Sequence, residues 1–439
     1  MQSAGSLRVG QRLARIRDSR LARQNLILFA GGLVAGLGGF VYHAIAGRVL
    51  GPATYGEVAS LIALYAVGNA PTFILTLVLA RYAATLLAHN NRAGIRSLLT
   101  RTTWLVAIPG LVALLVTGVL AVPFASFLHL GSPIPLLVLG FAIALVWQLA
   151  MPRGILQGMQ RFTALSSNLS LEMVVRMSAL VALLWAGYAV SGAMAAVVLG
   201  ITAAYGLGLF TLRGLPHPRE RARLRAMAGF SLTAAAGTLG VLLLYNQDVI
   251  LARHYLDPHA AGIYGGLNKI GSIIFFLTLS VSQVMFPRVV EAVAKDQHPG
   301  RLLLISVGLI VAMGSGALIV FGLLPGLVVR VLFGAGFLDA VPYILLVGVI
   351  GIALSLDNLL VQFLMAVHDR VFVPILAGAC ALQAGLIVAF HDGVGQVVAD
   401  TLFTLLALVA ALVVRYLLLL PRLRPEMVVE EPLASPLKT

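Results

Sequence analysis

The sequence has very few of the residues on which catalysis and cofactor binding depend. Its single cysteine, Cys380, excludes an intrachain disulfide, and it has no cluster of Cys and His. None of its three lysines (Lys269, Lys295 and Lys438) follows a glycine, so it has no G-K-[ST] phosphate-binding loop. It also has no H-E-x-x-H or G-x-S-x-G motif. ATP-driven transport by this chain alone is therefore excluded, and we expect no catalytic residue, no metal site and no cofactor.

Charge is equally scarce, and apolar residues take its place. Charged residues make up 10% of the 439 and hydrophobic ones 60%, whereas about half apolar is usual in a soluble domain. A run of about 20 apolar residues crosses a bilayer as a helix, whereas barrel strands alternate over about ten. The sequence predicts an all-α polytopic membrane protein with about twelve transmembrane helices, at 25–47, 57–80, 103–124, 134–152, 164–186, 190–212, 228–248, 262–286, 302–324, 340–366, 371–390 and 394–420.

The basic residues fall almost entirely in every second gap between these helices. Of the 30 Lys and Arg, 25 lie in the terminal tails and the alternate gaps on the same side. Three (Arg48, Arg253 and Arg330) lie in the opposite gaps, and two (Arg176 and Lys269) lie inside helices. The positive-inside rule then predicts a multi-pass inner-membrane protein with both termini in the cytoplasm. The net charge of +14 is thus mostly topological, and we expect no nucleic-acid partner.

A repeated pattern divides the chain into two blocks of six helices. Residues 50–56 after the first helix and 256–262 after the seventh both read Leu-x-Pro-x-x-x-Gly, offset by 206 residues. Because six is even, both blocks insert in the same orientation, and such paired bundles usually enclose a substrate site between them.

We therefore predict five regions. These are a basic cytoplasmic N-terminal tail (1–24), an N-lobe with six helices (25–212), a basic cytoplasmic linker (213–227), a C-lobe with six helices (228–420) and a cytoplasmic C-terminal tail (421–439).

Three segments resemble the polysaccharide and oligosaccharide flippases of the MOP exporter superfamily. Residues 48–56 (RVLGPATYG) resemble the first-loop pattern R-x-L-G-P-x-x-Y-G of that family. Residues 153–162 (RGILQGMQRF) resemble the segment after its fourth helix. Residues 248–264, followed by Phe286-Pro287, resemble the start of its second half. The resemblance extends over nearly the full length of the chain.

The resemblance implies a MOP/MATE-like fold with two pseudo-symmetric six-helix lobes that work by alternating access. It implies a flippase that moves polyprenyl-diphosphate-linked oligosaccharide from the cytoplasmic to the outer leaflet, through a cavity that is often cationic. Some family members draw on an ion gradient, so H⁺ or Na⁺ is an expected coupling ion. The expected partners are this lipid-linked substrate, membrane lipid, and a glycan polymerase or glycosyltransferase.

Cations inside or beside the predicted helices are candidate substrate-binding residues, because a charge inside a helix costs about 3 kcal/mol or more in a bilayer. Glu172 and Arg176 stand one helical turn apart, either as a structural pair or with Arg176 facing an anionic substrate. Lys269 either snorkels to the outer surface or contacts a phosphate or an acidic sugar. Arg48 and Arg253 lie at nearly equivalent outer helix ends, where they bind substrate, anchor to headgroups or pair with Glu57 or Asp248.

Three carboxylates, Glu172, Asp248 and Asp357, are candidates for ion coupling. Glu172 serves either as the counter-ion of its arginine neighbour or as a protonatable switch. Asp248 follows a polar cluster at the outer end of the seventh helix, where helix-end solvation explains it equally well. Asp357 forms a polar stripe with Asn358 and Gln362 in the tenth helix.

Two other functions remain open at this point. An ion-coupled multidrug exporter of the same superfamily would favour an acidic, aromatic cavity. A membrane-embedded glycan polymerase or ligase commonly needs a larger outer loop than the roughly fifteen residues at 325–339. Because the cations within the helices favour an anionic cargo, we expect a flippase and not an enzyme.

Overall fold

The computed structural model describes residues 3–216, 232–295, 297 and 299–423, with side chains for 36–216, 235–295, 297 and 299–420. Most of the predicted linker and C-terminal tail, and the side chains of the predicted N-terminal tail, lie outside the described residues. The first half of the chain contains α1 (Ser3–Gly68), α2 (Ala70–Ala88), α3 (Arg92–Val119), α4 (Ala121–Phe127), α5 (Ile134–Gly158), α6 (Phe162–Trp185) and α7 (Ala189–Leu212). The second half contains α8 (Leu232–Tyr255), α9 (Pro258–Ala294), α10 (Gly300–Leu323), α11 (Pro325–Leu332), a 3-10 helix (Ala335–Tyr343), α12 (Ile344–Ala366), α13 (Phe372–Ala389) and α14 (Val394–Leu423).

Helix α1 consists of two helices joined at Gly51. Gly51 has φ 70° and ψ 170°, a backbone conformation that glycine adopts without steric cost. Pro52 follows at the first position of the next helix, where its missing N–H is not needed. Residues 36–88 would extend about 80 Å as a single helix, far more than a bilayer core of about 30 Å. The eleven candidate membrane segments among the described residues therefore hold the predicted twelve crossings.

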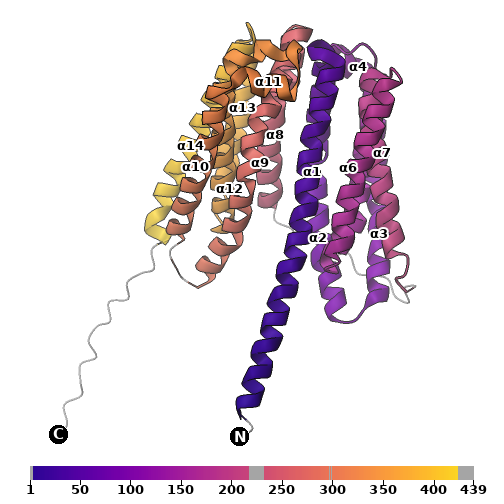
Figure 1. Cartoon of the computed structure of the whole chain (residues 1–439), viewed down its shortest axis with the longest axis vertical. Helices are drawn as coiled ribbons and strands as arrows, with labels where there is room; N and C mark the ends of the chain where they lie inside the picture. The colour runs from indigo at the N-terminus through magenta and orange to yellow at the C-terminus, as the bar shows by residue number, and fades with distance from the viewer. Residues whose placement is uncertain (1–2, 217–231, 296, 298, 424–439) are drawn as a thin grey trace, which may run out of the picture.

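The two halves of the chain form two helical lobes that lie side by side (Figure 1). Helices α1–α7 make up the N-lobe and α8–α14 the C-lobe. The lobes meet at one end, which we call the closed end, and separate at the other, the open end, where α1 begins and α14 ends. Residues 52–88 and α9 are equivalent, since both cover 37 residues and begin 206 residues apart. The predicted pair of pseudo-symmetric six-helix lobes is confirmed, while the exact limits of the regions stay predictions.

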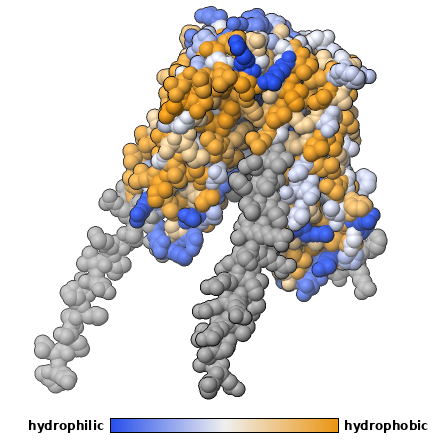
Figure 2. Space-filling view, viewed as in Figure 1, coloured by the Kyte–Doolittle hydropathy of each residue, from blue (hydrophilic) through white to orange (hydrophobic). Residues whose placement is uncertain are grey.

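The outer surface of both lobes is apolar around the middle and polar at the two ends (Figure 2). Large apolar side chains of both lobes face outward, among them Trp104, Trp185 and Leu323, with exposed fractions of 73%, 93% and 75%. In water such a surface would aggregate, whereas lipid tails cover it without cost. The chain is a multi-pass membrane protein.

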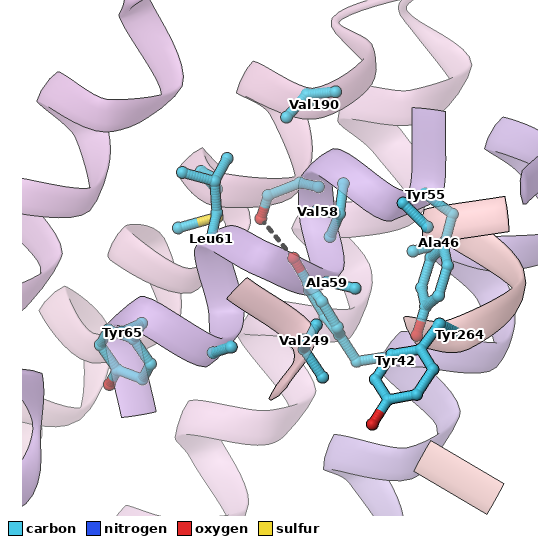
Figure 3. Packing of buried hydrophobic residues seen from close by; sticks show 14 of the residues in the cluster. Tyr42, Ala46, Tyr55, Val58, Ala59, Leu61, Tyr65, Val190, Val249 and Tyr264 are labelled. Atoms are coloured by element: carbon cyan, nitrogen blue, oxygen red, sulfur yellow. Dashed lines mark hydrogen bonds between the residues drawn. The ribbon is translucent and has the colours of Figure 1, made fainter. Parts of the chain in front are cut away.

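The closed end is built around a buried cluster that includes residues of both lobes. Figure 3 shows Tyr42 and Val58 of α1 packed near Val249 of α8 and Tyr264 of α9. The ring of Tyr55, also in α1, lies 5.5 and 5.6 Å from the rings of Phe333 and Phe337, beside α11. The predicted outer gap at 325–339 is therefore largely helical, and it packs onto the opposite lobe.

The repeated Leu-x-Pro-x-x-x-Gly pattern has a structural reason at this end. Its two glycines, Gly56 and Gly262, face each other across the lobes. A Cβ atom on Gly262 would overlap the carbonyl group of Pro52, and one on Gly56 would lie 3.0 Å from the backbone nitrogen of Gly262. Only the absence of both side chains lets the two backbones come this close.

An ion pair at the open end of the C-lobe carries a pH-dependent prediction. The carboxylate of Asp369, in the turn after α12, accepts hydrogen bonds from Nε and Nη2 of Arg415, at 3.2 and 2.7 Å. Burial alone would raise the pKa of Asp369, but the Arg415 guanidinium outweighs it, and the net pKa is below its ordinary value. A lowered carboxylate pKa stabilises the fold above the unfolded pKa of about 4, and this stabilisation disappears as pH falls through the folded pKa.

Asp369→Asn is therefore expected to lower the melting temperature at pH 7 by about 1–3 °C, since such pairs contribute about 0.2–1 kcal/mol. The difference from the wild type should shrink at pH 3. Thermal unfolding of the purified protein in detergent measures both values. Arg370→Gln is the control, because the exposed side chain of Arg370 lies outside the pair. An equal deficit at both pH values would contradict the ion-pair explanation.

Candidate functional site

A polar cavity opens in the N-lobe between α2, α5 and α6. Its volume is about 590 Å³, and it is lined by both polar and apolar side chains. The charged and amide side chains in its wall are Asn69, Arg153, Gln157, Glu172 and Arg176. These residues come from helices that were each predicted from hydropathy, but their convergence in one cavity depends on how the helices pack.

Two arginines share one carboxylate in this cavity. Glu172 accepts a hydrogen bond from Nη2 of Arg153 on Oε2, at 2.5 Å, and one from Arg176 on Oε1. Nε of Arg153 donates to Oδ1 of Asn168 at 2.8 Å, and Nδ2 of Asn168 donates to the carbonyl oxygen of Ala204 at 2.5 Å. The predicted Glu172–Arg176 pair is present, but it is part of a group of three charges with one positive charge in surplus.

Arg176 keeps hydrogen-bonding capacity for a ligand. Its side chain is 11% exposed, the hydroxyl of Tyr65 lies beside it, and its Nε has no hydrogen-bond partner. A guanidinium removed from water pays a large desolvation cost, which one shared carboxylate offsets only in part. An anionic group in the cavity would supply the remaining compensation.

Arg153 is the candidate site residue that sequence reasoning missed. The fourth helix was predicted to end at Pro152, which placed Arg153 in a cytoplasmic gap and counted it as a topological charge. Helix α5 instead continues to Gly158, and Arg153 lies inside it. The signal in the sequence was the pair of glycines at 154 and 158. In the structure, a Cβ atom on either glycine would come within 3 Å of the α2 backbone, because this stretch is a helix packed closely against α2.

Lys269 does not snorkel to the surface. Its side chain is buried in α9 with 7% exposed, and Nζ lies 5.0 Å from the centre of the Tyr245 ring. Both Lys269 and Arg176 lie within electrostatic range of His43 in α1. The structure therefore brings two predicted substrate-binding cations from opposite lobes toward the same region, although Lys269 does not line the N-lobe cavity.

Asp248 lies in a small pocket of the C-lobe. Helix α8 continues to Tyr255, so Asp248 sits two turns inside it with 2% exposed, and helix-end solvation does not explain it. Its Oδ2 accepts hydrogen bonds from Tyr264 Oη at 2.6 Å and from Asn268 Nδ2 at 3.1 Å. Oδ1 of Asp248 and Oδ1 of Asn268 have no hydrogen-bond partner. The pocket has a volume of about 20 Å³, enough for one water-sized occupant.

Asp357 is buried without a partner. It is 1% exposed, both of its carboxylate oxygens lack hydrogen bonds, and no basic side chain among the described residues forms an ion pair with it. Its predicted stripe divides in the structure. Asn358 and Gln362 are hydrogen-bonded to each other at 3.3 Å, and both line a cavity of the C-lobe. Asp357 does not line this cavity.

Arg48 and Arg253 lie at the closed end, away from the cavity. Nε and Nη2 of Arg253 donate to the carbonyl oxygens of Leu128 and His129, at 2.8 and 2.7 Å, just after α4 of the opposite lobe. Arg48 donates in the same way to the carbonyl oxygen of Val331, at the end of α11.

These two arginines form a reciprocal connection between the lobes, since each binds the end of a short helix that belongs to the other lobe. Arg253 also lies 3.5 Å from Glu57, one of the partners expected from the sequence. Their predicted role in substrate binding stays a prediction, and the structure does not bring them together with Arg176.

Comparisons with known proteins agree with this architecture. The sequence profile of the polysaccharide biosynthesis protein family matches residues 21–293, more than half of the chain. No curated protein matches the chain by sequence.

Solved transporter structures share the fold. A multidrug resistance MATE family transporter of the MOP superfamily has a TM-score of 0.75 in its inward-facing conformation, with 11% identity over 89% of this chain and 95% of that chain. An outward-facing MATE structure has a TM-score of 0.64, with 13% identity and coverages of 92% and 95%.

A MOP superfamily transporter from Pyrococcus furiosus, in which reverse polarity of the binding pocket suggests a different function, has a TM-score of 0.62. It is 13% identical over 92% of this chain and 95% of that chain. Together with the repeated lobes described above, these matches show that the chain belongs to the polysaccharide biosynthesis protein family and has the fold of the MOP superfamily transporters.

Proposed function

We propose that this protein is an inner-membrane flippase that moves a polyprenyl-diphosphate-linked oligosaccharide from the cytoplasmic to the outer leaflet by alternating access. The observation that carries the proposal is the surplus positive charge of the Arg153–Glu172–Arg176 group in the N-lobe cavity. Diphosphate is the anion that such a group suits, since guanidinium groups bind phosphate oxygens through paired N–H donors.

The shape of the molecule supports the same cycle. Both described ends of the chain lie at the open end of the lobes (Figure 1), and the positive-inside rule assigns this end to the cytoplasm. The cavity would then be open to the leaflet in which the lipid-linked substrate is made. Opening to the other side requires the contacts at the closed end to break, including those of Gly56, Gly262, Arg48 and Arg253.

Pocket polarity separates this proposal from drug export. A cavity for cationic drugs needs uncompensated acidic groups. The N-lobe cavity has the opposite balance, because its one carboxylate is already shared by two arginines. No enzymatic step is needed for this function.

The proposal is tested by mass spectrometry of lipid extracts from cells depleted of the protein and from complemented cells. A polyprenyl-diphosphate oligosaccharide should accumulate on depletion and disappear on complementation. If no lipid-linked intermediate accumulates while the glycan pathway is running, the flippase proposal is wrong. Increased sensitivity to cationic dyes in the same depleted cells would then favour the multidrug exporter.

The Asp248 pocket supports coupling to a cation gradient. Its free groups are all oxygen atoms, which suits a small hard cation such as Na⁺, and it has room for one such occupant. Both carboxylate oxygens of Asp357 lack a hydrogen-bond partner among the described residues, so Asp357 suits a proton better than a metal cation. Lys269, buried near Asp248, would compete with a bound cation for the same carboxylate.

Asp248→Asn is expected to remove the cation dependence of transport. The change keeps the shape of the side chain and removes the only carboxylate in the pocket. Transport in proteoliposomes should then be the same with and without a Na⁺ or H⁺ gradient, whereas the wild type should be faster with one of them. Asp392→Asn is the matched control, because Asp392 lies in the turn between α13 and α14, outside the pocket. An unchanged gradient dependence in Asp248→Asn would rule out this pocket as the coupling site.

A further inference from the structure

A second cavity lies in the C-lobe, directly beside the cationic one. It has a volume of about 350 Å³ and is lined mainly by α8, α9 and α12. Phe73 of α2 lines both cavities, so the two cavities are neighbours that share this side chain. A ligand held by the arginines of the N-lobe would extend into the second cavity along this shared wall.

The wall of this second cavity contains an amide pair. Nε2 of Gln362 donates to Oδ1 of Asn358 at 3.3 Å, which fixes the orientation of both side chains. Asn358 is nine-tenths buried, and its Nδ2 has no hydrogen-bond partner. A buried amide that lacks a partner costs about 1–3 kcal/mol, so this donor is expected to have a ligand during the working cycle.

Aromatic side chains share the wall of this cavity with the amide pair. Phe275 and Phe286 line the same cavity, and both are partly exposed. The ring of Phe275 stacks on the ring of Tyr245 at 5.7 Å, and Nζ of Lys269 lies over the Tyr245 ring, 5.0 Å from its centre. The cavity thus has apolar faces, a fixed amide donor and a neighbouring cation, but its lining includes no charged residue.

This combination suits a neutral sugar ring. A hexose has faces of C–H groups that pack on aromatic rings, and a rim of hydroxyls that pair with amide groups. A polyprenyl chain has no atom that accepts a hydrogen bond from the free amide donor. A diphosphate would meet no positively charged residue in the lining of this cavity. In a sugar attached to a diphosphate, the first ring must lie within a few ångströms of the phosphates, which matches two neighbouring cavities that share Phe73.

We propose that Asn358 and Gln362, with Phe275 and Phe286, form a subsite that binds the first sugar of the lipid-linked substrate. This inference rests on the proposed flippase function. It makes the C-lobe the part of the protein that distinguishes a glycosylated carrier from the bare diphosphate carrier, whereas the N-lobe arginines bind both.

The test compares two classes of probe on the purified protein. Farnesyl diphosphate is the bare probe, and farnesyl diphosphate linked to glucose, galactose or N-acetylglucosamine forms the glycosylated panel. Wild-type protein should bind at least one glycosylated probe about tenfold more tightly than the bare one, the gain expected for one or two hydrogen bonds. Asn358→Leu and Gln362→Leu should each remove most of this gain and leave the affinity for bare farnesyl diphosphate unchanged.

Two controls make the result specific. Gln148→Leu removes an amide from α5 that lies outside both cavities, and it should keep the sugar-dependent gain. Arg176→Gln should weaken all probes equally. The subsite is wrong if no glycosylated probe binds more tightly than the bare one, or if Asn358→Leu weakens both classes alike. Failure of farnesyl diphosphate itself to bind, or equal binding to wild type and Arg176→Gln, would instead count against the proposed function.

Discussion

Arg176→Gln is expected to reduce transport of the lipid-linked substrate by about 10- to 100-fold. A hydrogen bond to a charged group contributes about 1.5–3 kcal/mol, and the substitution removes both the positive charge and the unpartnered Nε of a residue that lines the cavity. The fold should survive, because Glu172 keeps its hydrogen bond from Arg153 at 2.5 Å. The measurement is flipping of a fluorescent lipid-linked diphosphate oligosaccharide in proteoliposomes, normalised to the amount of folded protein.

Arg161→Gln is the matched control for this experiment. Arg161 lies just after α5, donates to the carbonyl oxygen of Thr211 at 2.9 Å, and does not line the cationic cavity. Its loss should leave the transport rate within about twofold of the wild type. Glu172→Gln should behave differently from both, because it leaves two buried guanidinium groups without a counter-ion and is expected to lower stability by about 3–5 kcal/mol. Normal transport by well-folded Arg176→Gln would show that the arginine group is purely structural.

Gly262→Val is expected to abolish transport by forcing the lobes apart at the closed end. Even the Cβ atom would overlap the carbonyl group of Pro52, and this neighbour is backbone, which cannot turn aside like a side chain. Overpacking of this kind costs about 1–3 kcal/mol, which reduces the population of the closed-end conformation by about 5- to 150-fold. Since alternating access needs both conformations, a shift toward one of them stops the cycle.

Spin labels on the two lobes report the shift directly. In a Cys380→Ser background, cysteines at Val49 and Leu327 place labels on exposed sites of α1 and α11, at opposite sides of the closed end. Pulsed electron spin resonance should show a longer distance in Gly262→Val than in the parent protein. Gly308→Val is the control, because a Cβ atom at Gly308 meets no neighbour within 4 Å, and both distance and transport should be unchanged. An unaltered distance in Gly262→Val would mean that the lobes tolerate the added volume.

The repeated motif illustrates how far sequence reasoning reached. The Leu-x-Pro-x-x-x-Gly pattern correctly indicated two equivalent halves. It did not indicate that Gly56 and Gly262 touch. That contact joins residues 206 positions apart, and local patterns carry no information about which equivalent segments meet on the axis between the lobes.

The charged residues show the same division. Spacing within one helix predicted the Glu172–Arg176 pair, because i and i+4 share a face whatever the rest of the fold does. Arg153 was missed because it belongs to another helix and stands 19 residues from its partner. Arg48 and Arg253 were recognised as exceptions to the charge rule, but their carbonyl partners are more than 120 residues away in the chain.

The sequence by itself determined the membrane class, the number of crossings, the division into two blocks and the predicted side of the termini. Each of these follows from the solvent, since lipid demands runs of about 20 apolar residues and loops with basic residues favour one side. The tertiary structure alone decided which charges share a cavity, which carboxylates are left without partners and which residues join the lobes. Such pairings depend on how helices pack side by side, and hydropathy leaves this open because every apolar helix face suits both lipid and a neighbouring helix.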